Sequence, residues 1–272
     1  IDSLEAKGAR VIREPWTQSD LSSIGIKRDI TLPEGIDYVH RHADDADIYF
    51  MSNQTDNTIS FVPEFRAVRA NKYIADPMTG KVYNAQNELT LTAGASLFVV
   101  LTDQKIDAED MPDMSKYDTA ISLDGNKWTV KFEKTGKQVT TKKLFDWSKA
   151  DDQSVKFYSG HATYETTFKY KGKPEGRVFI DLGEVADIAT VYVNGKMCGT
   201  AWMPPYNVDI TPAVKKGKNE LKIVVVNTWA NALQGNDQGT PPFEGIWTNG
   251  KYRRASKELL PAGLLGPVVI KN

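Results

Sequence analysis

The stretches Tyr158–Phe168, YSGHATYETTF, and Arg177–Ile210, RVFIDLGEVADIATVYVNGKMCGTAWMPPYNVDI, decide the fold of this chain. Apolar and polar residues alternate in TYETTF and in ATVYV, and a period of two residues is typical of a half-buried β-strand. Asn194-Gly195 separates two such strands, and this pair favours a type I′ hairpin turn, because both central residues of that turn need a positive φ. We therefore expect an antiparallel β-sandwich.

Composition sets the outer limits of the interpretation. A length of 272 residues suits one large domain or two ordinary ones. The net charge of −1 gives no electrostatic reason to expect a nucleic acid or an anionic membrane as partner, and no apolar run is long enough to span a bilayer. Cys198 is the only cysteine, which excludes an intrachain disulfide and a cysteine-based zinc cluster. We expect Cys198 to be a small buried hydrophobic residue.

The spacing of short strands predicts an all-β chain of two antiparallel sandwich modules. Residues 36–104 form the smaller module, residues 105–117 a linker that is acidic and poor in large aliphatic side chains, and residues 118–272 the larger module. Residues 1–35 begin with a predicted short helix and strand, IDSLEAKGARVI. These two elements cannot bury their apolar faces alone, so we expect a remnant of an upstream α/β domain. A processed N-terminus is the alternative.

Several local predictions follow from turn residues and alternation. Thr58–Phe65 is expected to be one strand, and Glu220–Asn227 a buried strand. Asp146, Trp147 and Asp151 are expected in a turn-rich surface segment. Residues 231–258 are rich in Gly, Asn and Pro and are too long for a hairpin turn, so we expect an excursion loop.

Four motifs occur in order over residues 118–272: SGHATYETTF, DLGEVADIATVYVNGKMCGTAWMPPYNVDIT, NTWANAL and LLPAGLLGPVVI. In these motifs the chain resembles the sugar-binding jelly roll of glycoside hydrolase family 2, a galactose-binding-like fold. The resemblance is greatest to the version in the C-terminal region of α-L-rhamnosidase-like proteins of glycoside hydrolase family 106. The segment IDYVHRHADDADIYF also resembles the corresponding part of those proteins.

The resemblance implies that the catalytic acids lie in an upstream barrel, so we expect no catalytic residue in this chain. Glycoside hydrolysis needs two carboxyl groups on either side of the bond that is cleaved. Glu165 lies on an alternating strand, where a solvent-facing position is the better interpretation. The other carboxylates considered are Glu175, Glu184, Asp187, Asp209, Glu220 and Glu244.

Contacts with carbohydrate or with another domain are expected at one rim of the larger module. A pyranose ring is bound by an aromatic face and a few fixed polar groups. Trp202 and Tyr206 border a stiff Pro-Pro loop, and Asn231 and Trp247 belong to the excursion, together with Gln234 and Asn249. The alternative is that the tryptophans only pin loops onto the core, and we favour this for Trp229.

His40 and Arg41 form a further candidate pair, because they end a predicted strand in the segment that resembles the rhamnosidase-like proteins. They could reach an adjacent domain or a substrate. The alternative, which we favour, is that these two side chains form a structural ion pair with Asp47 or Asp45.

No cofactor is expected, although a structural calcium is an option in jelly rolls of this type. The oxygen ligands would come from Asp146, Asp151 and Asp152 or from Asn236 and Asp237, whose spacing favours solvated loop charges instead.

Three functional hypotheses remain open. The first is a non-catalytic C-terminal accessory region of a large secreted glycoside hydrolase, with an upstream catalytic domain and carbohydrate as partners, located in the periplasm, outside the cell or at the cell surface of a bacterium. The second is an independent pair of carbohydrate-binding modules that target a polysaccharide. The third is a structural or adhesin-like surface protein. The helix and strand at the start of the chain favour the first hypothesis.

Overall fold

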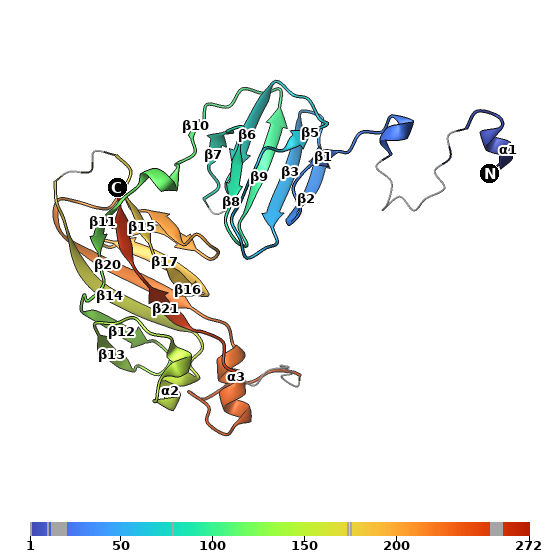
Figure 1. The fold of residues 1–272 in the computed structure, drawn as a ribbon. Coiled ribbons are helices and arrows are strands. Elements are labelled where there is room, and N and C mark those ends of the chain that lie inside the picture. The colour runs from blue at the N-terminus through green and yellow to red at the C-terminus, as the bar shows by residue number, and fades with distance from the viewer. Residues whose placement is uncertain are drawn as a thin grey trace. The chain divides into compact units, whose positions relative to one another are not determined.

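The computed structural model describes residues 2–9, 11, 21–77, 79–172, 174, 176–250 and 258–272. The chain forms two compact units, Ile1–Met111 and Pro112–Asn272 (Figure 1). Strands make up 42% of the structure and helices 9%, which confirms the all-β class. None of the helices in the described ranges has the length and hydropathy needed to cross a membrane.

The first unit is a sandwich around a six-stranded sheet with the order β10-β7-β6-β9-β3-β2. Two short pairs of antiparallel strands, β1–β5 and β4–β8, pack against one face of this sheet. They complete the core with residues such as Ile30, Phe61 and Leu89. In chain order the elements are α1 (Asp2–Glu5), the 3-10 helix η1 (Ser22–Ile24), β1 (Ile30–Thr31), β2 (Ile36–His42), β3 (Ala46–Asn53), β4 (Ile59–Phe61), β5 (Glu64–Phe65), β6 (Asn71–Ala75), β7 (Val82–Asn84), β8 (Leu89–Leu91), β9 (Ser96–Thr102) and β10 (Glu109–Asp110).

The single strand expected at Thr58–Phe65 is divided into β4 and β5, which pair with different partners. Pro63 lies between them, and its missing N–H interrupts a strand. At the start of the chain the predicted helix is present as α1. Val11 lies outside any strand, and Ile12, the other residue of the predicted strand, lies outside the described residues.

The second unit is a jelly roll in which a six-stranded sheet, β13-β12-β14-β20-β17-β18, shares its core with a four-stranded sheet, β11-β22-β15-β19. A short ribbon, β16–β21, adds to them. In chain order the elements are η2 (Met114–Lys116), β11 (Thr119–Ser122), β12 (Trp128–Phe132), β13 (Gln138–Thr141), η3 (Trp147–Lys149), α2 (Gln153–Lys156), β14 (His161–Tyr170), β15 (Phe179–Asp181), β16 (Glu184–Ala186), β17 (Ile188–Val193), β18 (Lys196–Ala201), β19 (Asn207–Asp209), β20 (Gly217–Val226), α3 (Ala230–Asp237), β21 (Gly263–Gly266) and β22 (Val269–Lys271).

The predicted hairpin is formed by β17 and β18 around Asn194-Gly195, whose φ angles are 51° and 80°. The Asn194 side chain donates to the Ala213 carbonyl and accepts from the Glu220 N–H, so it also ties the turn to β20. Cys198 packs against the core as expected, but it is only half-buried and not fully buried.

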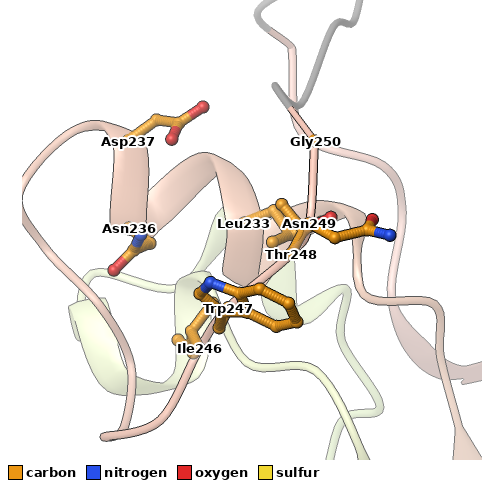
Figure 2. A pocket seen from close by; sticks show the side chains of 8 residues that line it. All are labelled: Leu233, Asn236, Asp237, Ile246, Trp247, Thr248, Asn249 and Gly250. Carbon is orange, nitrogen blue, oxygen red and sulfur yellow. The ribbon is translucent and has the colours of Figure 1, made fainter.

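Two local expectations for the second unit are wrong. The excursion over residues 231–258 begins with a helix, α3, and Figure 2 shows Leu233, Asn236 and Asp237 on it. Asp146 and Trp147 were expected at the surface but are buried, and the Trp147 side chain is part of the core, whereas Asp151 is exposed in a bend as expected. Long-range bonds explain this burial: the Trp147 indole N–H donates to the Tyr164 hydroxyl over 2.7 Å, and the Trp147 backbone N–H donates to the Ala262 carbonyl.

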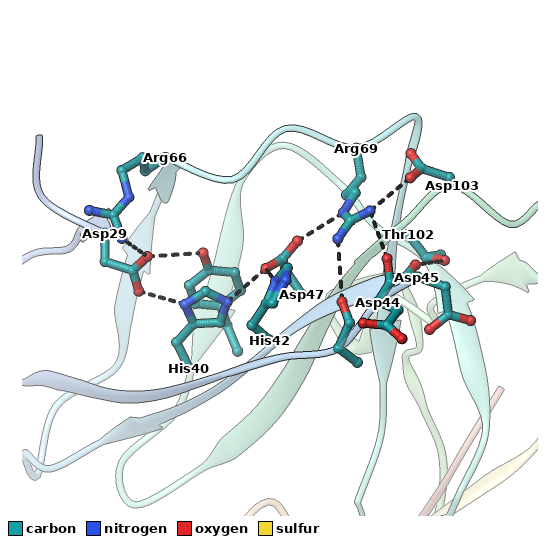
Figure 3. A network of polar contacts seen from close by, with 12 residues as sticks. Asp29, His40, His42, Asp44, Asp45, Asp47, Arg66, Arg69, Thr102 and Asp103 are labelled. Atoms are coloured by element: carbon teal, nitrogen blue, oxygen red, sulfur yellow. Dashed lines mark hydrogen bonds and ion pairs between the residues drawn. The ribbon is translucent and has the colours of Figure 1, made fainter.

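A polar network crosses the first unit and is centred on the buried carboxylate of Asp47 (Figure 3). Its Oδ1 contacts His40 Nε2 at 3.0 Å and His42 Nδ1 at 2.7 Å, and its Oδ2 accepts from Arg69 Nε at 2.9 Å. The other ring nitrogen of His40 pairs with Asp29 at 2.9 Å. A neutral imidazole has one N–H, so His40 donates to both carboxylates only when the ring carries both protons. The geometry matches the structural ion pair between His40 and Asp47 that was the favoured alternative.

Gly263→Ala is expected to destabilise the second unit strongly. Gly263 has a φ of 108°, and an added Cβ would lie 2.5 Å from Nε1 of the buried Trp147. Gly217 also has a positive φ, 92°, but has open space around it, so Gly217→Ala is the matched control. We expect Gly217→Ala to cost about 1 kcal/mol of backbone strain and Gly263→Ala about 2 kcal/mol more through overpacking. Urea unfolding of the second unit measures both, and equal losses would contradict the packing described for Trp147.

Asp47→Asn is expected to destabilise the first unit at pH 5.5 much more than at pH 2. Burial is the largest effect and raises the pKa of the Asp47 carboxyl, but the hydrogen bonds from His42, Arg69 and His40 outweigh it and lower that pKa to about 2. A lowered pKa stabilises the fold above the ordinary value of 3.8, and this contribution is lost as the pH falls through about 2. Its size is about 2 kcal/mol.

The measurement is urea unfolding of the first unit at both pH values. Asp103→Asn is the control, since Asp103 is at the exposed end of the same network. A cost of Asp47→Asn that does not change with pH would contradict this role of the charge.

Candidate functional site

An open hollow of about 630 Å³ lies beside α3 in the second unit (Figure 2). Two segments line it: the outer part of α3 and the chain that returns along it after Phe243. The lining residues are Leu233, Asn236, Asp237, Ile246, Trp247, Thr248, Asn249 and Gly250.

Backbone and side-chain bonds fix α3, which forms one wall of this hollow. The buried amide of Asn231 donates to the Leu260 carbonyl and accepts from the Leu260 N–H. The Ala232 N–H donates to the Ser159 hydroxyl. Gly235 lets the helix approach Phe157 closely, because a Cβ at this position would lie 2.7 Å from that ring. The helix is therefore a fixed wall rather than a loose excursion.

The other wall is anchored by aromatic contacts. The Phe243 ring lies 5.9 Å from both the Trp229 and the Tyr158 rings, and Lys134 Nζ lies 4.2 Å from the centre of the Trp229 ring. Trp229 thus takes part in holding this loop on the core, as the alternative for it expected.

Trp247 is the most exposed tryptophan with a described side chain, at 79% of its surface, while the preceding Ile246 is buried. Ile246 anchors the loop, and the adjacent indole remains open to solvent. Asn236 and Asn249 supply amide donors and acceptors around it, and Asp237 supplies a carboxylate. An accessible aromatic face with a few polar groups suits the apolar side and the hydroxyls of a sugar ring.

The loop that follows β18 lies at the same end of the six-stranded sheet as α3, but its residues do not line the hollow. In the strand register Ala201 pairs with Ala189, and Ile188 pairs with Val226, so the loop and α3 both follow strand ends at this edge. Trp202 in this loop is 51% exposed. Tyr206 is half-buried, and burial raises the pKa of its hydroxyl, with smaller contributions from the carboxylates of Asp187 and Glu184.

The remaining predicted site residues lie elsewhere. Asn231 is buried and bonded to Leu260, so it supports α3 without lining the hollow. His40 and Arg41 are neighbours on β2 and therefore project to opposite faces of the first unit's sheet. His40 belongs to the Asp47 network, whereas Arg41 is exposed.

The carboxylates considered from sequence have local structural tasks where the structure describes their bonds. Asp187 accepts from the Thr228 N–H and Asp209 from the Thr211 N–H. Glu165 is exposed on β14, as expected, and Glu175 lies outside the described residues.

Two of the carboxylates considered as calcium ligands already accept hydrogen bonds within the chain. Asp146 and Asp152 each accept the backbone N–H and the hydroxyl of the serine two residues on. In the described part of the chain, no group of three or more His, Cys, Asp or Glu is arranged to hold a metal ion.

Sequence reasoning anticipated Trp247 and Asn249 but missed the place of Leu233, Asn236 and Asp237 in the hollow. Asn236 and Asp237 were considered only as oxygen ligands. The run ANALQ contains good helix formers, and this signal could have placed the three residues on one helix.

Comparisons with known proteins agree with this architecture. The model of the alpha-L-rhamnosidase family matches residues 4–88. A model described as glycosyl hydrolase 2 galactose-binding domain-like matches residues 126–258. The solved structure of a rhamnosidase from Novosphingobium sp. PP1Y is 33% identical with a TM-score of 0.76, covering 94% of this chain and 26% of that chain. A putative beta-glucuronidase of Formosa agariphila is 34% identical over 53% of this chain and 15% of its own length.

The chain thus spans well under half of either relative. The resemblance inferred from the sequence is confirmed: the first part of the chain is similar to alpha-L-rhamnosidases, and the second part is similar to the galactose-binding-like domain of glycosyl hydrolase family 2.

Proposed function

We propose that this chain is a non-catalytic accessory region of a larger, secreted, α-L-rhamnosidase-like glycoside hydrolase, and that the hollow beside α3 contacts carbohydrate. The observation that carries the proposal is the hollow itself, which is lined by the exposed Trp247 ring, the amides of Asn236 and Asn249, and the carboxylate of Asp237. Sugar rings are bound by this combination of an apolar platform and a few polar groups.

The carboxylates support the non-catalytic part of the proposal. Among the residues that the structure describes, Asp237 is the one carboxylate that lines the hollow. Hydrolysis of a glycoside by the usual routes needs a second carboxyl group about 5–10 Å away, across the bond that is cleaved. The hollow offers binding without this pair, so the catalytic acids would belong to the remaining part of the longer protein.

The size of the relatives supports a larger parent protein. This chain corresponds to 26% of the solved rhamnosidase, which leaves ample chain for a catalytic domain. In such a protein the loop from Trp202 to Tyr206, in which the Trp202 side chain is exposed, would contact the catalytic domain and brace it. Degradation of a rhamnose-containing polysaccharide outside the cytoplasm is the role that this arrangement would serve.

An independent carbohydrate-binding function is the second candidate, and the 79% exposure of Trp247 is compatible with both candidates. The two candidates differ in what Trp202 does. In the longer protein, Trp202→Ala would lower kcat/KM or stability if the loop braces the catalytic domain, and would change neither if the modules act independently.

Trp247→Ala is expected to weaken carbohydrate binding by this chain about tenfold or more, because the stacking surface is lost. Isothermal titration with rhamnose-containing oligosaccharides measures the effect. Trp202→Ala is the matched control, since it removes another exposed tryptophan that does not line the hollow, and it should leave binding unchanged. Equal binding of the oligosaccharide by the unmodified chain and by the Trp247→Ala variant would contradict the assignment of a carbohydrate site to the hollow.

The isolated chain is expected to show no hydrolysis of an aryl α-L-rhamnoside, because the described residues that line its hollow include a single carboxyl group, that of Asp237. Release of the chromogenic aryl group, followed beside the longer protein as positive control, is the measurement. Turnover by the isolated chain that survives Asp237→Asn would show that it contains catalytic acids elsewhere, and turnover abolished by that change would place catalysis in the hollow. Either result would overturn the non-catalytic assignment.

A further inference from the structure

The six-stranded sheet of the first unit has a second apolar face. Burial alternates along β3 and β9, with Tyr49, Met51, Leu97 and Val99 buried in the core and the residues between them half-buried. We call the opposite side of β2, β3 and β9 the outer face. Its apolar residues are Val39, Ile48, Phe50, Phe98 and Val100.

The strand register makes the outer face continuous. Val39, Phe50 and Phe98 lie side by side across β2, β3 and β9. Ile48 and Val100 form the next row. The Phe50 and Phe98 ring centres are 5.0 Å apart. The five side chains therefore form one patch and not isolated surface residues.

An antiparallel sheet that faces water usually alternates apolar and polar residues, whereas apolar residues on both faces are typical of a sheet covered on both sides. None of the five outer-face residues packs into the core cluster of the unit, and Val39 is 64% exposed. The segment after β9 covers part of this side, since the Ile106 N–H donates to the Tyr73 hydroxyl on β6. β2 has one pairing partner among the described strands, so its other edge is unpaired.

We propose that the outer face is the surface on which this chain docks against the rest of the longer rhamnosidase-like polypeptide, an inference that rests on the function proposed above. Two observations select this occupant. The alpha-L-rhamnosidase family model covers residues 4–88 and so includes β2 and β3. The solved rhamnosidase has about four times the length of chain that this sequence spans, which supplies a covering surface.

The docking partner is therefore an apolar surface of that remaining chain. Arg41 follows Val39 on the same face of β2 and pairs with Ile48 in register, so it borders the patch. We expect the docking partner to place a carboxylate opposite Arg41 at the rim of the patch. A charge pair there would fix the orientation of docking more than it would raise the affinity.

Hydrogen exchange of the β2 amides tests the proposal in the longer polypeptide and in this chain alone. We expect exchange at Val39 and Arg41 to be about tenfold or more slower in the longer polypeptide, because a docked surface protects the edge strand from local opening. Exchange at equal rates would overturn the proposal. Slowing with rising concentration of this chain alone would also overturn it, because a second copy would then be the occupant.

Substitutions give an independent arm. Val39→Asp should lower the melting temperature of this chain only slightly, because Val39 is exposed here and Asp has a low strand propensity, and should lower that of the longer polypeptide by several degrees more. Val68→Asp is the matched control, because Val68 is 89% exposed in the same unit and lies outside the sheet. An equally large loss of melting temperature for Val39→Asp in this chain alone would contradict the proposal, because the loss would then arise without the rest of the longer polypeptide.

These results are distinguishable from a failure of the proposed function. The assays of hydrolysis and of sugar binding use the isolated chain, and their results do not depend on whether the outer face is covered. Slow exchange in the longer polypeptide would stand even if Trp247 bound no sugar, and equal exchange would remove the docking surface without affecting the hollow.

Discussion

The hydrogen bond from the buried Trp147 indole to the Tyr164 hydroxyl is the contact on which the second unit depends most. The same hydroxyl accepts from the Leu264 N–H, and the Trp147 backbone N–H donates to the Ala262 carbonyl, so β14, η3 and β21 meet at one point. Burial raises the pKa of the Tyr164 hydroxyl, although the two hydrogen bonds that its oxygen accepts, from Leu264 and Trp147, act to lower it. Breaking such a bond inside a core leaves a polar group without a partner, which costs more than the bond itself contributes.

The candidate site is built outward from this point. Residues Leu260 to Leu264 are held against the core, and Leu260 in turn bonds both sides of the Asn231 amide at the start of α3. A fixed α3 then supplies one wall of the hollow, and Ile246 anchors the other, which leaves the Trp247 ring exposed between them. The position of an aromatic platform at the surface is therefore set by polar bonds deep in the sandwich.

Local patterns predicted part of this structure. Asn194-Gly195 predicted its hairpin and the alternation in TYETTF predicted β14, because turn geometry and strand period depend on neighbouring residues. The sequence did not predict the burial of Trp147, because this burial depends on Ala262, more than a hundred residues away. It did not predict α3 either, because the Gly, Asn and Pro content of residues 231–258 indicated a loop. Trp247 was named from its residue type, whereas its neighbours Asn236 and Asp237 required knowledge of the helix. His40 and Arg41 are adjacent in sequence and on β2, so strand geometry places their side chains on opposite faces of the sheet.

The most direct test of the central claim follows the tryptophan indole N–H signals by NMR while this chain is titrated with a rhamnose-containing oligosaccharide. The chain has six tryptophans, so each signal is assignable by single substitution. We expect the Trp247 signal to shift in a saturable way while those of the buried Trp128 and Trp147 stay in place. A saturable shift at Trp202 without one at Trp247, or no shift at all, would contradict a carbohydrate site beside α3.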